Sequence, residues 1–278
     1  MKHATFDAYP AEGLDLARRT LITVWDSLVA YHDDLVLVGG LAVDLITHPP
    51  VEGVAGAVTM DVDLGVSLAA GLGMYGSIAE TLAGHGFRWE EGRFIRVIDG
   101  LRMYVDLLTD DGRSLRGTAM VDEGLGVSIL PGIERALASR RAIPVKGCSL
   151  VGGERTLLVQ TASVGPLLVL KLNAFGGPTG RKAPKDAHDV MHLLTNYLDG
   201  PSAAVAAFHE EWQTNRGMAG AVEALKTCFL SPEADGSLAC AAFRLNNRHL
   251  EPELEEESLQ IRQQCVTFAE ALLAGLPG

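Results

Sequence analysis

Thr59-Met60-Asp61-Val62-Asp63-Leu64 is the stretch on which the predicted fold of this chain depends. In an extended strand, side chains at alternate positions point the same way, so Asp61 and Asp63 should place two carboxylates on one face. Two like charges that close are costly to keep ionised unless a cation lies between them. Oxygen ligands favour Mg²⁺, Mn²⁺ or Ca²⁺ over zinc, so the stretch predicts a divalent-metal site.

A strand and a helix are predicted on the two sides of the Gly39-Gly40 pair that precedes this stretch. Leu35–Val38 is an apolar run typical of a buried strand, and Leu41–Ile46 has the pattern of a helix opening. Glycine lets a backbone approach a ligand closely, and a helix N-terminus favours negative charge. The order strand, diglycine, helix therefore indicates a phosphate-binding turn.

These elements, in this order, resemble the nucleotidyltransferase superfamily of the polymerase beta type. Its signature is a strand, a Gly-Gly or Gly-Ser turn into a helix, and an Asp-x-Asp strand. The family adds a third carboxylate on a neighbouring strand, for which Asp106 is the candidate. Residues 170–175, with Lys171, and residues 181–190 are similar to two further elements of the AbiEii/AbiGii toxin branch. The four elements span residues 30–200 in broad terms.

The resemblance implies an α/β (α+β) fold, with a nucleotidyltransferase-type mixed sheet flanked by helices and then a helical C-terminal domain. Residues 1–155 would form the nucleotidyltransferase core, and residues 156–278 a helical domain that closes the cleft. The implied reaction moves a nucleoside monophosphate from an NTP to a hydroxyl acceptor and releases pyrophosphate. Mg²⁺ or Mn²⁺ is the implied cofactor. Such chemistry asks a protein mainly to position reactants and stabilise charge.

The resemblance also assigns roles to residues. Asp61, Asp63 and Asp106 would be the catalytic metal ligands, and Asp106 would also help to deprotonate the acceptor. A second set would bind the nucleotide: Gly39, Gly40, Thr59, Lys171, Arg181, Lys182, Lys185 and Asp186.

Two features of this second set can be read from the residues alone. Lys171 interrupts an apolar helix, so its ammonium must reach water or meet an anion. Asp186 and Asp189 are three residues apart and share a helix face, where first-turn acids could also stabilise the N-terminus.

Three interpretations stay open: two classes of acceptor for the transfer reaction, and a protein that does not catalyse it. The AbiEii-like branch implies the 3′ end of a tRNA or a protein hydroxyl as acceptor, and a cognate antitoxin. Gly39–Asp44 is also similar to antibiotic nucleotidyltransferases, which take a small aminoglycoside-like acceptor, and a net charge of −12 would attract such a cation. A non-catalytic nucleotide-binding or regulatory module is the third, because Gly40 and Asp61 are further apart than in the compact family pattern.

Composition narrows the class of protein. The 278 residues are 47% hydrophobic, which suits one large domain or two ordinary ones. The net charge argues against broad, nonspecific nucleic-acid binding. No apolar run approaches the ~20 residues that cross a bilayer, and the N-terminus lacks a signal-peptide core. Four widely spaced cysteines without a Cys-x-x-Cys pair fit a reducing compartment, so we expect a cytoplasmic protein without a membrane partner.

Further patterns predict local structure. His188 and His192 have the spacing of a zinc-binding helix pair, but a third ligand is not evident, and we expect His188 to be exposed and His192 partly packed. Asp99-Gly100 predicts a two-residue hairpin. The remaining expectations are helices over residues 10–32, 75–84, 133–142, 164–175, 185–197, 201–229 and 254–274, a loop over 47–58, a strand over 145–151 and a linker over 231–236.

Overall fold

The computed structural model of the chain describes residues 3–49, 55–67, 76–122, 125–178 and 180–277. The chain packs as two compact units, each discontinuous in sequence. The sheet unit consists of Ala11–Leu45 and Val58–Ser163, and the helical unit of Met1–Pro10, Ile46–Ala57 and Val164–Gly278. The predicted ranges 1–155 and 156–278 differ from these units, because the last strand continues to Ala162 and the segment Ile46–Ala57 packs with the helices.

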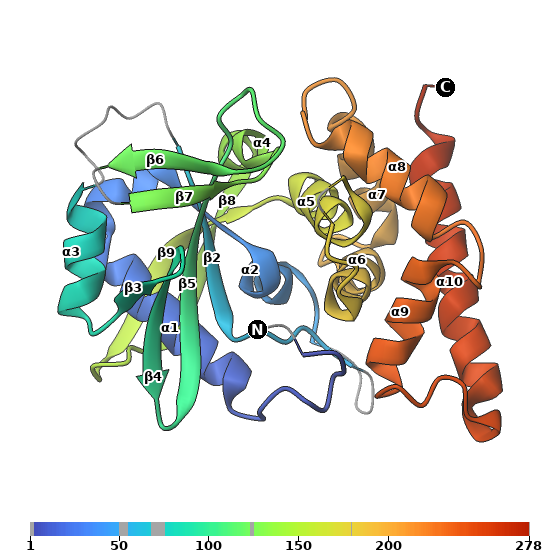
Figure 1. The fold of residues 1–278 in the computed structure, drawn as a ribbon, viewed down its shortest axis with the longest axis horizontal. Helices are drawn as coiled ribbons and strands as arrows, with labels where there is room; N and C mark the ends of the chain where they lie inside the picture. Colours follow the sequence, from blue (N-terminus) through green and yellow to red (C-terminus); the bar gives the residue numbers. More distant parts are fainter. Residues whose placement is uncertain (1–2, 50–54, 68–75, 123–124, 179, 278) are drawn as a thin grey trace. The chain divides into compact units, whose positions relative to one another are not determined.

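The described residues of the sheet unit form a nine-stranded mixed sheet with the main order β3-β4-β5-β2-β1-β9-β8, in which β7 also pairs with β5 and β6 with β7 (Figure 1). The strands are β1 (Leu35–Val38), β2 (Asp61–Val66), β3 (Arg88–Glu90), β4 (Arg93–Ile98), β5 (Leu101–Thr109), β6 (Thr118–Asp122), β7 (Leu125–Ile129), β8 (Arg140–Cys148) and β9 (Glu154–Ala162). Its helices are α1 (Gly13–Ser27), the 3₁₀ helix η1 (Val29–Asp34), α2 (Gly39–Ile46), α3 (Gly76–Gly84) and α4 (Ile133–Ala138).

Parallel and antiparallel pairs alternate across the centre of this sheet. β2 runs antiparallel to β1 and parallel to β5, and β1 runs parallel to β9. Helices α1 and α4 pack against the sheet. The coarse prediction of a mixed sheet flanked by helices and followed by a helical C-terminal region is confirmed.

Local signals located several elements well. β1 and the opening of α2 lie where the apolar runs around Gly39-Gly40 predicted them. β4 and β5 form an antiparallel hairpin, in which Asp99 and Gly100 both have positive φ angles, 50° and 82°. That backbone is the one that an Asp-Gly turn favours. Helix α3 also lies within its predicted range, although Tyr75 falls outside the described residues.

The second half of the sheet unit departs from the predictions in two bounds and in three strands that were missed. The helix predicted over 133–142 ends at Ala138, and the strand predicted over 145–151 instead covers Arg140–Cys148. The strands β6, β7 and β9 were not predicted. β8 pairs with β9 along its whole length, so tertiary pairing overrides the weak helical pattern at its start. In the predicted loop 47–58, residues 50–54 lie outside the described residues.

The helical unit is built around one buried helix, α5, which contacts α6, α7 and α8. In Figure 1, α9 and α10 run beside each other at the end of the chain, in agreement with their contacts. The linker predicted over 231–236 is shorter, because α9 already begins at Asp235. The helices are α5 (Val164–Gly176), α6 (Pro184–Asn196), α7 (Pro201–Glu210), α8 (Met218–Cys228), α9 (Asp235–Arg244), the 3₁₀ helix η2 (Pro252–Leu254) and α10 (Glu255–Ala274).

Two segments from the first part of the chain complete this unit. Thr47 forms an isolated bridge with Tyr197, and the backbone N–H of Phe6 donates to the carbonyl of Phe243 at 3.2 Å. None of the helices in the described part of the chain is long and apolar enough to cross a membrane.

Candidate functional site

Asp61, Asp63 and Asp106 lie on one face of the sheet. β2 and β5 are parallel neighbours, and their register places Asp63 opposite Asp106 and Asp61 opposite Tyr104. The intervening Val62 and Val105 are fully buried on the other face. The structure therefore brings together the three carboxylates that the family resemblance implied as metal ligands.

Gly39 lies directly against this group. Its φ is +71°, in the left-handed region, and a Cβ added to it would lie 1.8 Å from the Oδ2 atom of Asp63. The antiparallel pairing of Val38 with Asp63 sets this approach. Only glycine leaves room for the Asp63 carboxylate here. Gly40 follows in the first turn of α2.

Arg93, which sequence reasoning missed, lies among the carboxylates. Its Nε donates to Asp106 Oδ1 at 2.8 Å, and a terminal nitrogen donates to Asp106 Oδ2 at 2.5 Å. The same nitrogen is 3.5 Å from Asp61 Oδ1, and the guanidinium carbon is 4.0 Å from the centre of the Tyr104 ring. The Asp99-Gly100 signal could have revealed this contact, because strands paired around a two-residue turn place Arg93 across from Asp106.

The electrostatics of the group are dominated by excess negative charge. Burial, reinforced by repulsion from Asp63, raises the pKa of Asp106 to about 7, and attraction to Arg93 opposes this only in part. Burial acts to lower the pKa of Arg93, but attraction to Asp106 and Asp61 outweighs it and raises that pKa. One guanidinium thus faces three carboxylates.

The residues of this group suit a hard divalent cation in their chemistry. All three acids supply oxygen donors, and Asp61 Oδ1 is a buried atom that accepts no hydrogen bond from the described residues. In the arrangement shown, however, the described His, Cys, Asp and Glu side chains form no ready-made metal cluster of three or more. Both oxygens of Asp106 are taken by Arg93, so a metal ion would have to share or exchange Asp106 with that arginine.

Thr59 is placed beside the carboxylates by its own hydrogen bonds. Its Oγ1 accepts from the backbone N–H of Asp61 at 3.1 Å and donates to the carbonyl of Asp61 at 3.3 Å. The side chain is buried, with 4% exposure. The hydroxyl predicted to contact nucleotide therefore also orients the start of β2.

Three residues of the predicted nucleotide-binding set form a buried ionic cluster with Asp189 inside the helical unit. Lys171 and Lys185 donate to the same oxygen, Asp189 Oδ2, at 2.5 and 2.6 Å. Asp186 Oδ1 is 3.7 Å from the Lys171 ammonium. Burial acts to raise the pKa of Asp189, but the two lysines outweigh it and hold that pKa below its ordinary value. Lys171 therefore has an anionic partner, Asp189, within its own unit.

The other two basic residues are exposed. The Arg181 side chain is 62% exposed, and one of its terminal nitrogens is 3.6 Å from Asp186 Oδ2. Lys182 pairs with Asp235, and both are largely exposed. The predicted basic set is therefore split between buried lysines and surface side chains.

The expectation that His188 is exposed was wrong. His188 is fully buried and His192 is 1% exposed. His188 Nε2 lies 2.9 Å from the carbonyl of Gly56, and His192 Nε2 lies 3.1 Å from the hydroxyl of Thr47. Burial, together with repulsion from His188, lowers the pKa of His192 to about 4. Both imidazoles therefore have structural hydrogen-bonding partners inside the helical unit.

Comparison with known proteins gives no further assignment: no family model and no curated protein matches this chain.

Proposed function

We propose that this protein is a metal-dependent nucleotidyltransferase of the polymerase beta type, which moves a nucleoside monophosphate from an NTP to a hydroxyl acceptor. One observation carries the proposal: Asp61, Asp63 and Asp106 share one sheet face, with Asp63 and Asp106 in register and the Gly39 turn pressed against Asp63. Carboxylates on adjacent strands beside a glycine turn that opens a helix suit a triphosphate with its cation.

The roles of the residues follow from their surroundings. Asp61 and Asp63 would hold Mg²⁺ or Mn²⁺, which when bound offsets charge on the phosphate oxygens. Asp106 is the proposed general base for the acceptor hydroxyl, because its carboxylate lies in register with Asp63, and burial and repulsion from Asp63 raise its pKa. The backbone amides of Gly39 and Gly40 are the proposed phosphate donors.

The acceptor and setting of this proposal follow the AbiEii-like resemblance. A tRNA 3′ end is the first acceptor to test, and the proposed setting is a cytoplasmic toxin with a cognate antitoxin. Arg181 and Lys182 are proposed to offset triphosphate charge, and their exposed side chains are accessible to a nucleotide. A small cationic antibiotic is the alternative acceptor.

The test is transfer of label from each α-³²P NTP, with Mg²⁺ or Mn²⁺, to bulk tRNA, to the protein itself or to an aminoglycoside. Asp61→Asn and Asp63→Asn should abolish labelling. Asp99→Asn is the matched control, because it makes the same change at an exposed hairpin position whose positive φ asparagine tolerates. Equal labelling by all variants, or none by the wild type with any acceptor, would refute the proposal.

A second candidate, a nucleotide-binding module without turnover, is favoured by Arg93. This residue already supplies a cation to Asp106 and lies close to Asp61. A module of this kind would bind NTP with equal affinity in EDTA and in Mg²⁺ and would label no acceptor. Equilibrium dialysis of labelled NTP under both conditions separates the two candidates.

A further inference from the structure

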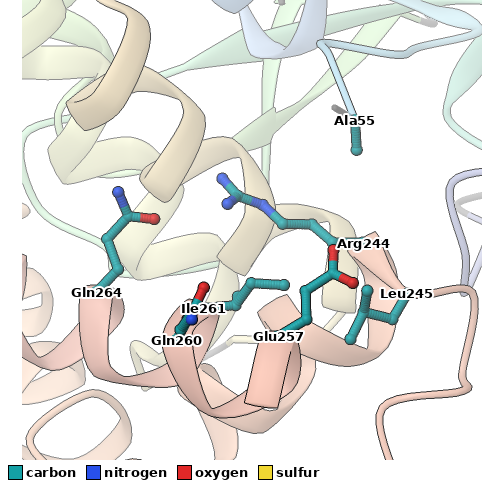
Figure 2. Close-up of a pocket in the computed structure, with 7 residues that line it drawn as sticks. All are labelled: Ala55, Arg244, Leu245, Glu257, Gln260, Ile261 and Gln264. Atoms are coloured by element: carbon teal, nitrogen blue, oxygen red, sulfur yellow. The ribbon is translucent and has the colours of Figure 1, made fainter. Parts of the chain in front are cut away.

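The helical unit contains a cavity of about 480 Å³, and its lining includes none of the proposed catalytic residues Asp61, Asp63 and Asp106. Its described walls come from the end of α9, one face of α10 and Ala55. Figure 2 shows the lining residues, which are Ala55, Arg244, Leu245, Glu257, Gln260, Ile261 and Gln264. The volume lies within the range of small-molecule sites.

Arg244 is anchored at its inner nitrogen. Its Nε donates to His188 Nδ1 at 3.3 Å, and His188 Nε2 lies 2.9 Å from the carbonyl oxygen of Gly56. A carbonyl can only accept, so Nε2 carries the proton and Nδ1 is the acceptor for Arg244. The His188 ring is buried and stacks on Phe243, with ring centres 4.9 Å apart. The arginine stem is therefore held in place before any ligand binds.

The outer nitrogens of Arg244 are directed to the cavity. Figure 2 shows the guanidinium at the cavity, with the side chains of Gln260 and Gln264 on the facing helix. Among the described residues no carboxylate lies within ion-pair distance of Arg244, although Glu257 lines the same cavity. With Nε engaged by His188, the two terminal nitrogens of the planar guanidinium still form one edge whose N–H groups match a carboxylate or a phosphate group.

We infer that this cavity is a binding site for a small organic molecule that carries one anionic group. Arg244 binds the carboxylate or phosphate, and the amides of Gln260 and Gln264 hydrogen-bond the polar part of the molecule. Leu245 and Ile261 contact its apolar part. Glu257 repels further negative charge, so the site discriminates against polyanions such as nucleoside triphosphates.

The test is calorimetric titration of the full chain with inorganic phosphate, a nucleoside monophosphate, a monocarboxylic amino acid and an NTP. We expect saturable binding of an organic probe with one anionic group, the nucleoside monophosphate or the amino acid, and weaker binding of the NTP. Saturation by the monophosphate alone identifies phosphate as the recognised group, and saturation by the amino acid alone identifies carboxylate; each supports the site. Absence of saturable binding by all four probes overturns it.

Two variants on α10 control for general charge effects. Gln264→Glu places a carboxylate in the cavity and should weaken binding about tenfold or more, because like charges repel at short range. Gln263→Glu makes the same change at the neighbouring exposed position, outside the cavity lining, and should leave the affinity unchanged. Equal loss in both variants would show that the effect is not local and would overturn the assignment. NTP transfer is not part of this readout, so the site can fail while the proposed function stands.

Discussion

Replacing Gly39 by alanine tests the closest contact in the proposed site. The new Cβ would lie 1.8 Å from Asp63 Oδ2 and 2.8 Å from Asp63 Cβ, separations that side-chain motion alone cannot fully relieve. The left-handed φ of +71° adds backbone strain. Gly100→Ala is the matched control, since Gly100 has a similar φ of +82° but an added Cβ meets no atom within 4 Å.

The expected losses of stability follow from the left-handed backbone and from the clash with Asp63. Left-handed backbone costs a non-glycine residue about 1 kcal/mol, so Gly100→Ala should lose about that much free energy of unfolding. Gly39→Ala should lose a further 1–3 kcal/mol or so, because it forces an extra carbon into packed surroundings. Most of this excess should disappear when Asp63 is also replaced by alanine, which removes the two closest atoms.

Urea unfolding followed by tryptophan fluorescence measures these differences. A Trp212→Phe background restricts the signal to Trp25 and Trp89, which both belong to the sheet unit. NTP transfer by Gly39→Ala should also fall below that of Gly100→Ala. If the two glycine variants lose equal stability, the packing of Gly39 against Asp63 is not as the structure describes.

Three further predictions concern the charged groups. The pKa of Asp106 is about 7 in the folded protein against an ordinary 3.8. The stability that this proton contributes is therefore complete below pH 3.8 and is lost as the pH rises through about 7. The contribution of Asp106 should make the free energy of unfolding of the wild type fall between pH 3.8 and about pH 7, and this contribution should be missing in Asp106→Asn. Equal pH dependence in the two proteins would contradict the assignment. Arg93→Gln removes the cation shared by the carboxylates, so its melting temperature in EDTA should fall and Mn²⁺ should raise it more than in the wild type. Arg88→Gln, in an exposed pair, should change stability by less than about 0.5 kcal/mol and leave the Mn²⁺ response unaltered. Asp189→Asn removes the buried carboxylate to which Lys171 and Lys185 both donate, and should cost about 3–5 kcal/mol of unfolding free energy, whatever its effect on activity. Asp235→Asn, at the exposed end of a surface pair, should cost less than about 0.5 kcal/mol, and similar losses in the two variants would refute the burial argument.

Patterns that depend on neighbouring residues were readable from the sequence. The apolar run of β1, the glycine turn into α2 and the Asp99-Gly100 hairpin were all located correctly. The alternation that places Asp61 and Asp63 on one face is a property of any extended strand. Such features are set by backbone geometry over a few residues, so local sequence is sufficient to specify them.

The tertiary structure decided the composition of the site. Placing Asp106 beside Asp63 requires β2 and β5 to pair in parallel at one register, although many residues separate them in the chain. Arg93 meets Asp106 through the β4–β5 hairpin, but it reaches Asp61 only because β2 pairs with β5.

The burial of charged residues was also decided at this level. Lys171 and His188 became buried because partners distant in the chain, Asp189 and Gly56, satisfy them. Strand β9 was missed for a related reason: it is stabilised by its pairing with β8 more than by any local pattern. Register and charge compensation depend on which segments meet in the folded protein, and local patterns alone do not encode that information.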